Sequence, residues 1–191
     1  MHIISKAKNR CLNLSNCYFK EHSANVLAIQ FMQYNLNVCS YDLSFNELGD
    51  KGVSRIAMAL QNTCHIVYLN LDMNSICWEG ASYLAKALRV NNSLIELSLS
   101  SGKSGGNNRN RVMERGAFEF SQSLPENKFL LFLNLTGNAI ANEGLSYLLP
   151  AIAQSNTLIS LNLTSNEINS GPIRQQVLKD KQRQGFSVRF V

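Results

Sequence analysis

The chain has 191 residues, of which 45% are hydrophobic and 16% charged, and its formal net charge at pH 7 is +5. This length suffices for one sizeable core, so the sequence predicts a single domain over residues 1–191. There is neither a run of roughly 18 apolar residues, as a membrane helix needs, nor a secretory signal peptide. We therefore expect a cytoplasmic protein, or one exported by a route that leaves no such signal.

The positive charge is concentrated in three segments. Residues 1–10, 101–116 and 171–191 carry net charges of +3, +3 and +4, so the rest of the chain is acidic. A nucleic-acid-binding protein usually gathers positive charge on a regular binding face, not at its ends and in one loop. The distribution argues against that class. Binding of nucleic acid or an anionic membrane through the basic loop and the C-terminal tail remains the alternative function.

The first predicted element is a polar, basic cap over residues 1–10. A motif of the form L-x-L-x-x-N-x-L then recurs, with its first position at 41, 69, 97, 133 and 161, and an earlier copy starts at Leu12. The later steps are 28, 28, 36 and 28 residues. Self-similarity at such a period is the signature of a solenoid. The sequence thus predicts six repeats over residues 11–170.

Each repeat contains the same local elements. The L-x-L segment predicts a short strand with one buried face. A glycine six residues after the asparagine opens an apolar pattern of helical period, as in the stretch from Gly52 to Leu60. One strand, one turn and one helix per repeat follow from this pattern.

The asparagine lies just beyond each strand, where the chain turns into the interior. Its amide can donate to and accept from backbone groups that have no partner in the sheet. Cysteine is a known alternative at this position. We predict a structural ladder, not a binding site, formed by Cys17, Asn46, Asn74, Asn110, Asn138 and Asn166.

The fourth repeat carries eight extra residues. Because Asn110 keeps its distance from Gly116, the insertion lies at about 100–109, with the sequence SSGKSGGNNR. Its glycines and its lack of apolar residues predict a solvated loop at the C-terminal ends of the strands, beside the concave face. The segment Gly102-Lys103-Ser104 is similar to the end of a phosphate-binding loop, but Leu97 stands where that loop needs glycine, so we expect no nucleotide.

The chain ends with a predicted cap over residues 171–191. Gly171-Pro172 is expected to open a last helix, because proline is tolerated in a first turn. Residues 186–191 alternate like one final strand that closes the sheet edge. On this pattern we expect a complete domain.

The repeat resembles the ribonuclease-inhibitor-like class of leucine-rich repeats over about residues 11–170. The resemblance implies an α/β solenoid, or horseshoe, with parallel strands on the concave side and α-helices on the convex side. It also implies that the chain binds a partner protein. The chain is similar to short free-standing arrays that intracellular bacterial pathogens secrete, which implies an effector acting on a host protein in the host cell. Similar arrays also form the sensor ends of large eukaryotic receptors.

Residues for catalysis or metal binding do not form a known pattern. Neither an H-E-x-x-H motif nor a paired-carboxylate motif occurs, so we expect no enzyme. The five cysteines are odd in number and include no C-x-x-C pair, which indicates neither a disulfide framework nor a zinc site. We expect reduced and mostly buried thiols, no metal and no cofactor.

The remaining candidates lie on the solvent side of the strands and just after them. Tyr68, Glu96 and Phe132 have the same offset in three successive strands, so they are predicted to form one row. Trp78, in the turn before Gly80, either contacts a partner or packs on the neighbouring turn. Aromatic groups among carboxylates are typical of a contact patch, although scattered exposed aromatics are also normal. The candidate partner-binding residues are Asp42, Phe45, Tyr68, Asp72, Met73, Trp78, Glu96 and Phe132.

Overall fold

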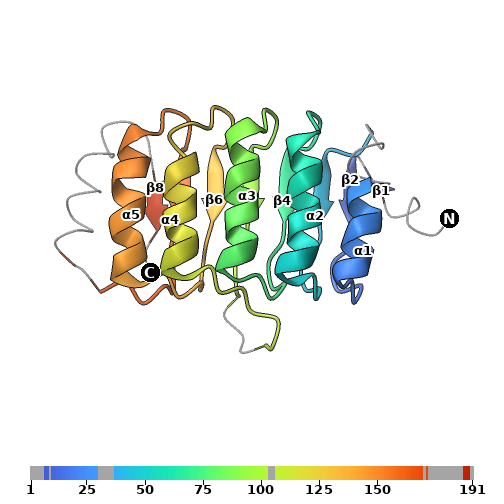
Figure 1. The fold of residues 1–191 in the computed structure, drawn as a ribbon, viewed down its shortest axis with the longest axis horizontal. Coiled ribbons are helices and arrows are strands. Elements are labelled where there is room, and N and C mark those ends of the chain that lie inside the picture. The colour runs from blue at the N-terminus through green and yellow to red at the C-terminus, as the bar shows by residue number, and fades with distance from the viewer. Residues whose placement is uncertain are drawn as a thin grey trace.

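The computed structural model describes residues 7–8, 10–29, 37–102, 106–169, 171 and 187–189. Within them, strands and helices alternate along the chain (Figure 1). The strands are β1 (Ala7–Lys8), β2 (Cys11–Asn13), β3 (Ser40–Asp42), β4 (Tyr68–Asn70), β5 (Glu96–Ser98), β6 (Phe132–Asn134), β7 (Ser160–Asn162) and β8 (Ser187–Arg189). The helices are α1 (Glu21–Val26), α2 (Gly49–Gln61), α3 (Trp78–Val90), α4 (Met113–Ser123) and α5 (Ala141–Gln154).

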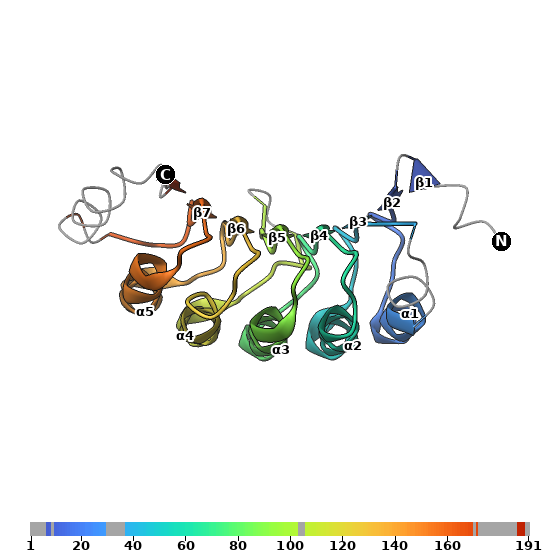
Figure 2. The ribbon, with the colours of Figure 1, turned by 90° about the horizontal axis from the view of Figure 1, so that it is seen from above.

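The strands form one sheet in chain order, from β1 to β8. Strands β2 to β8 are parallel, and β1 pairs with β2 in the antiparallel sense. Figure 2 shows the strands on the inner side of a shallow arc and the helices on its outer side. The predicted α/β solenoid, with parallel concave strands and convex helices, is confirmed.

The core lies between the sheet and the helices. Both leucines of each L-x-L segment are buried, as at Leu69 and Leu71, which are 0% exposed. The glycine that opens each helical pattern allows neighbouring helices to approach closely. A Cβ atom added at Gly144 would lie 3.1 Å from the Glu114 Cα atom and 3.1 Å from the Ala117 Cβ atom of α4. Small residues at these contacts therefore set the spacing of the helices.

The asparagines that follow the strands form a continuous ladder. The Oδ1 atom of Asn110 accepts hydrogen bonds of 3.0 Å from the backbone N–H groups of Asn74 and Ile76. Its Nδ2 atom donates to the carbonyls of Leu71 and Leu99, at 2.9 and 3.0 Å. Asn110 thus holds the ladder position in spite of the insertion. Comparable bonds are made by Asn46, Asn74, Asn138 and Asn166.

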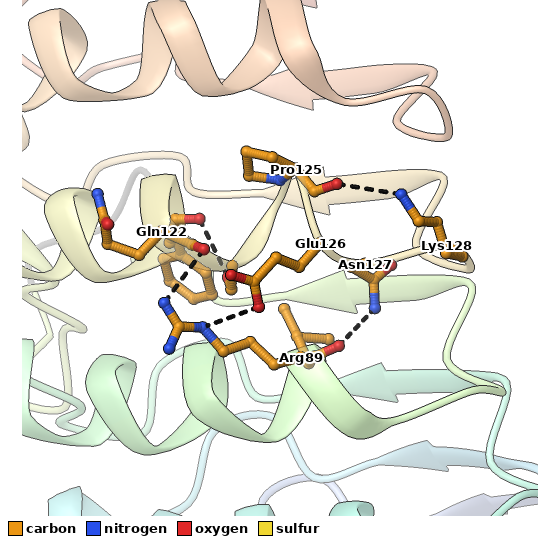
Figure 3. Close-up of polar contacts among 9 residues, drawn as sticks. Arg89, Gln122, Pro125, Glu126, Asn127 and Lys128 are labelled. Carbon is orange, nitrogen blue, oxygen red and sulfur yellow. Dashed lines mark hydrogen bonds and ion pairs between the residues drawn. The ribbon is translucent and has the colours of Figure 1, made fainter.

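A second set of buried polar residues lies at the opposite edge, where each helix returns to the next strand. Asn127 is 3% exposed, and its Nδ2 atom donates to the Leu88 carbonyl at 2.6 Å (Figure 3). Asn91 is 4% exposed and donates in the same way to the Leu60 carbonyl at 2.7 Å. Thr63 and Ser155 occupy the same position in other repeats and are also buried. The sequence analysis missed this set, although its spacing of 28, 36 and 28 residues repeats that of the strands.

An ion pair accompanies these buried bonds at the surface. Arg89 of α3 lies 3.6 Å from the Glu126 carboxylate and also donates to the Gln122 carbonyl at 3.2 Å (Figure 3). The two charged side chains are 41% and 61% exposed. An exposed pair of this kind contributes roughly 0–1 kcal/mol, so the buried asparagines dominate this contact between repeats.

The cysteines differ from expectation. Cys11 and Cys64 are exposed, and Cys17, Cys39 and Cys77 are partly exposed, so the expectation of mostly buried thiols is wrong. Cys17 takes the first ladder position, where its thiol donates to the Ser15 carbonyl at 3.4 Å.

The two predicted caps are described only in part. Residues 7–8 form β1, and residues 187–189 form β8 on the edge of β7. The helix expected from Gly171-Pro172 lies outside the described residues.

Candidate functional site

The predicted row of side chains is present on the concave face. The sheet register pairs Tyr68 with Glu96, and Glu96 with Phe132. Phe132 is 39% exposed, and the other two are half-buried. Burial raises the pKa of Tyr68, and the nearby carboxylates of Glu96, Asp42 and Asp72 raise it further. The row therefore combines aromatic surface with negative potential.

The side chains one pleat further along the strands, such as Asp42 and Asn134, form hydrogen bonds within the turn that follows each strand. The Oδ1 atom of Asp42 accepts from the backbone N–H and the hydroxyl of Ser44, at 3.0 and 2.7 Å. Asn134 accepts from Thr136 in the same way, at 3.1 and 2.7 Å. These side chains close the turn that leads into the asparagine ladder. Asp42 therefore has a structural role as well as a place beside the row.

Asp72 and Met73 do not have the free positions that the sequence analysis gave them. Asp72 accepts 2.6 Å hydrogen bonds from the Ser98 hydroxyl and the Ser100 backbone N–H, and burial raises its pKa. Met73 is only 4% exposed, so its expected position in solvent beside the row is wrong. A Cβ atom added at Gly106 would lie 3.1 Å from the Met73 methyl carbon, which shows that the insertion packs over this side chain.

The insertion is therefore more than a solvated loop. Asn108 donates to the Asn46 carbonyl at 3.2 Å, and its own carbonyl accepts from the Ser75 backbone N–H at 2.9 Å. Ser101 is fully buried. In Figure 2 the described part of the insertion lies on the strand side, beside β5. Residues 103–105, which include Lys103 of the basic loop, lie outside the described residues.

Phe45 and Trp78 lie apart from the row. Phe45 is 53% exposed and has a left-handed backbone with φ of 56°, which strains a residue of its size. Trp78 opens α3 on the helical side, and the guanidinium carbon of Arg115 lies 3.6 Å from its ring centroid. Of the two roles considered for Trp78, contact with the neighbouring turn is thus observed.

A groove that the sequence analysis did not anticipate surrounds this stack. It has a volume of about 420 Å³ and lies across the N-terminal halves of α3, α4 and α5. Phe118, 44% exposed, packs edge-on against Tyr147 with ring centroids 5.3 Å apart. The signal in the sequence that could have predicted this groove is the presence of aromatic residues on the polar side of the helical pattern. The groove is lined by Trp78, Glu114, Arg115, Phe118, Glu119, Glu143 and Tyr147.

Metal-binding clusters and membrane-spanning helices are both absent from the described residues. These residues include no group of three or more histidine, cysteine, aspartate or glutamate side chains that could hold a metal ion. None of the described helices has the length and apolar character needed to cross a membrane.

Comparison with known families agrees with the geometry. The family model described as "Leucine Rich repeat" matches residues 42–57, 126–149 and 154–171. Among solved structures, Leiomodin-1 Actin-Binding Site 2 is similar with a TM-score of 0.65 and 15% identity, over 85% of this chain and 91% of that one. The chain therefore carries leucine-rich repeats in the matched segments and shares its fold with this solved structure.

The curated relatives are much longer proteins. Human Centrosomal protein of 78 kDa is 23% identical over 203 aligned residues, which cover 98% of this chain and 29% of that protein. Human NACHT, LRR and PYD domains-containing protein 13 is 26% identical over 166 residues, which cover 85% of this chain and 15% of that protein. The chain thus spans less than a third of either relative.

Proposed function

We propose that this chain is a protein-interaction module and that its main contact surface is the concave row of Tyr68, Glu96 and Phe132. The observation that carries the proposal is the alignment of these side chains on three adjacent strands. The core does not require aromatic groups on this face, since both leucines of each strand already fill it. The carboxylates around Tyr68 favour a partner that presents basic and apolar side chains together.

The comparisons support binding as the general role. A solved structure that shares this fold is named as an actin-binding site, so a short solenoid of this shape serves protein binding in that protein. We further propose, from the resemblance to short bacterial arrays, that the partner is a host protein. The same concave row would provide the contact.

The test uses the double variant Tyr68→Ala with Phe132→Ala. Proteins captured from a host-cell lysate by the unaltered chain should be lost with this variant, while its thermal unfolding midpoint stays nearly the same. Tyr83→Ala is the matched control, because Tyr83 is 45% exposed on α3. Capture that persists with the folded double variant would contradict a concave contact surface.

Binding of nucleic acid or an anionic membrane is the second candidate function. It rests on the basic loop and tail, most of which lie outside the described residues, while Arg109 and Arg111 are exposed. Phosphate binding weakens steeply with salt, so a binding constant that is unchanged between low and moderate salt would remove this candidate.

A further inference from the structure

Trp78 stands at a position that has another use elsewhere in the solenoid. Four residues after the ladder asparagine, Asp50 accepts the backbone N–H of Cys77 at 2.7 Å, and Asn142 accepts that of Asn169 at 3.0 Å. Each of these side chains satisfies a backbone donor of the next repeat. Trp78 has the same offset from Asn74, but its side chain has no hydrogen-bond acceptor. At this position the indole ring therefore takes the place of a side chain that bonds to the next repeat.

The groove beside Trp78 is negatively charged. Its lining includes the carboxylates of Glu114, Glu119 and Glu143 against one guanidinium, that of Arg115. Among the described residues, no ion pair within 4.0 Å involves any of these carboxylates. Glu143 accepts a 3.1 Å hydrogen bond from the Tyr147 hydroxyl, and this bond raises the tyrosine pKa. The charge is therefore left largely uncompensated.

We propose that this convex groove binds a segment of a partner protein that carries arginine or lysine side chains. The aliphatic part of such a side chain would pack on Phe118 and Tyr147, while its cation meets the carboxylates. Arg115 already makes one contact of this kind, on the face of Trp78. The volume of about 420 Å³ accommodates one or two side chains, not a whole helix.

This surface is separate from the concave row. The groove lies on α3, α4 and α5, whereas the row lies on β4, β5 and β6. A loss of binding at one surface therefore leaves the other intact, and the two proposals can fail independently.

Trp78 provides a direct readout, because it is the only tryptophan in the chain. The probes are tri-arginine and tri-glutamate peptides with blocked ends. Titration with tri-arginine should change the tryptophan emission in a saturable way, and tri-glutamate should have no such effect. The net charge of +5 opposes general attraction of a basic peptide, so saturation reports local binding.

Two double variants decide the proposal. Each removes two carboxylate charges, the first variant inside the groove and the second outside it. Glu114→Gln with Glu143→Gln should weaken tri-arginine binding by about tenfold or more. Glu47→Gln with Glu167→Gln, two exposed carboxylates outside the groove, should leave the affinity unchanged. Equal affinity in both double variants, or no response to tri-arginine, would overturn the proposal. A response to tri-glutamate would also overturn it and mark Arg115 as an anion site.

Discussion

At the scale of single residues, Asn91 and Asn92 are neighbours with opposite environments. Asn91 is buried, and its side chain bridges the Leu60 carbonyl and the backbone N–H of Leu94, at 2.7 and 2.8 Å. Asn92 is exposed. The pair isolates what a buried amide contributes at the helix-to-strand return.

We expect Asn91→Ala to lower the free energy of unfolding by about 1–3 kcal/mol, because it leaves buried backbone groups unpaired. Asn92→Ala should change it by less than about 0.5 kcal/mol. Urea denaturation followed by circular dichroism measures both. Similar values for the two variants would show that the second polar set does not stabilise the solenoid.

Asp72 gives the stability a defined pH dependence. Burial raises its pKa from the ordinary value of 3.8 and outweighs the bonds from Ser98 and Ser100, which lower it. A raised pKa means that folding favours the protonated carboxyl. That contribution is fully present below the ordinary pKa and is lost as pH rises through the folded-state pKa.

Asp72→Asn keeps an oxygen that can accept both bonds but removes the buried charge. The melting temperature of the variant relative to the unaltered chain should therefore increase between about pH 3 and about pH 7. Thermal unfolding across this range tests the sign. A difference that is flat or falls with pH would contradict the assignment of the shift to burial.

At the scale of elements, the insertion between β5 and α4 has two parts. Its described C-terminal part packs on the body, where Gly106 covers Met73 and Asn108 bonds to Asn46 and Ser75. Because the insertion lies outside the repeat register, we expect deletion of residues 102–108 to leave the fold intact. The contacts of Asn108 change the expected stability but not the expected fold.

Deletion of residues 102–108 should leave the circular dichroism spectrum nearly unchanged and lower the free energy of unfolding by about 1–3 kcal/mol, because the Ser75 N–H loses its partner and Met73 becomes exposed. Deletion of residues 103–105 alone should cost much less, since a shorter surface loop changes closure entropy little. Equal losses for the two deletions would contradict a role for Asn108 and Gly106.

The elements themselves could be predicted because each repeat encodes its own strand and helix. Leu69 and Leu71, one pleat apart, define a buried strand face wherever the pattern recurs. The burial of Met73 could not be predicted, because it depends on a loop that has no counterpart in other repeats. Packing of Trp78 on its neighbour was one of two roles that the sequence left open. Its contact residue Arg115 could not be predicted, since the stack joins helices of successive repeats through side chains outside the motif.

At the scale of the whole molecule, each repeat is held by its neighbours at both edges of the sheet. Asn110 bonds to the preceding turn, at Asn74 and Leu71, and to its own turn, at Leu99. Asn127 bonds to the preceding helix. Cohesion of this kind acts only between neighbours, so stability should grow with the number of repeats. The concave row and the convex groove both extend over three repeats, and each therefore requires the assembled solenoid.

The insertion lengthens the chain without lengthening the solenoid. Leu97 pairs with Leu133 across β5 and β6 in the same register in which Leu69 pairs with Leu97, although the steps in sequence are 36 and 28 residues. The position of a repeat along the solenoid thus depends on the number of strands before it, not on the number of residues. Extra residues at this turn do not displace the repeats that follow. The turn after β5 can accept foreign segments of different lengths, which makes it a natural point for grafting a binding loop or an epitope onto the scaffold.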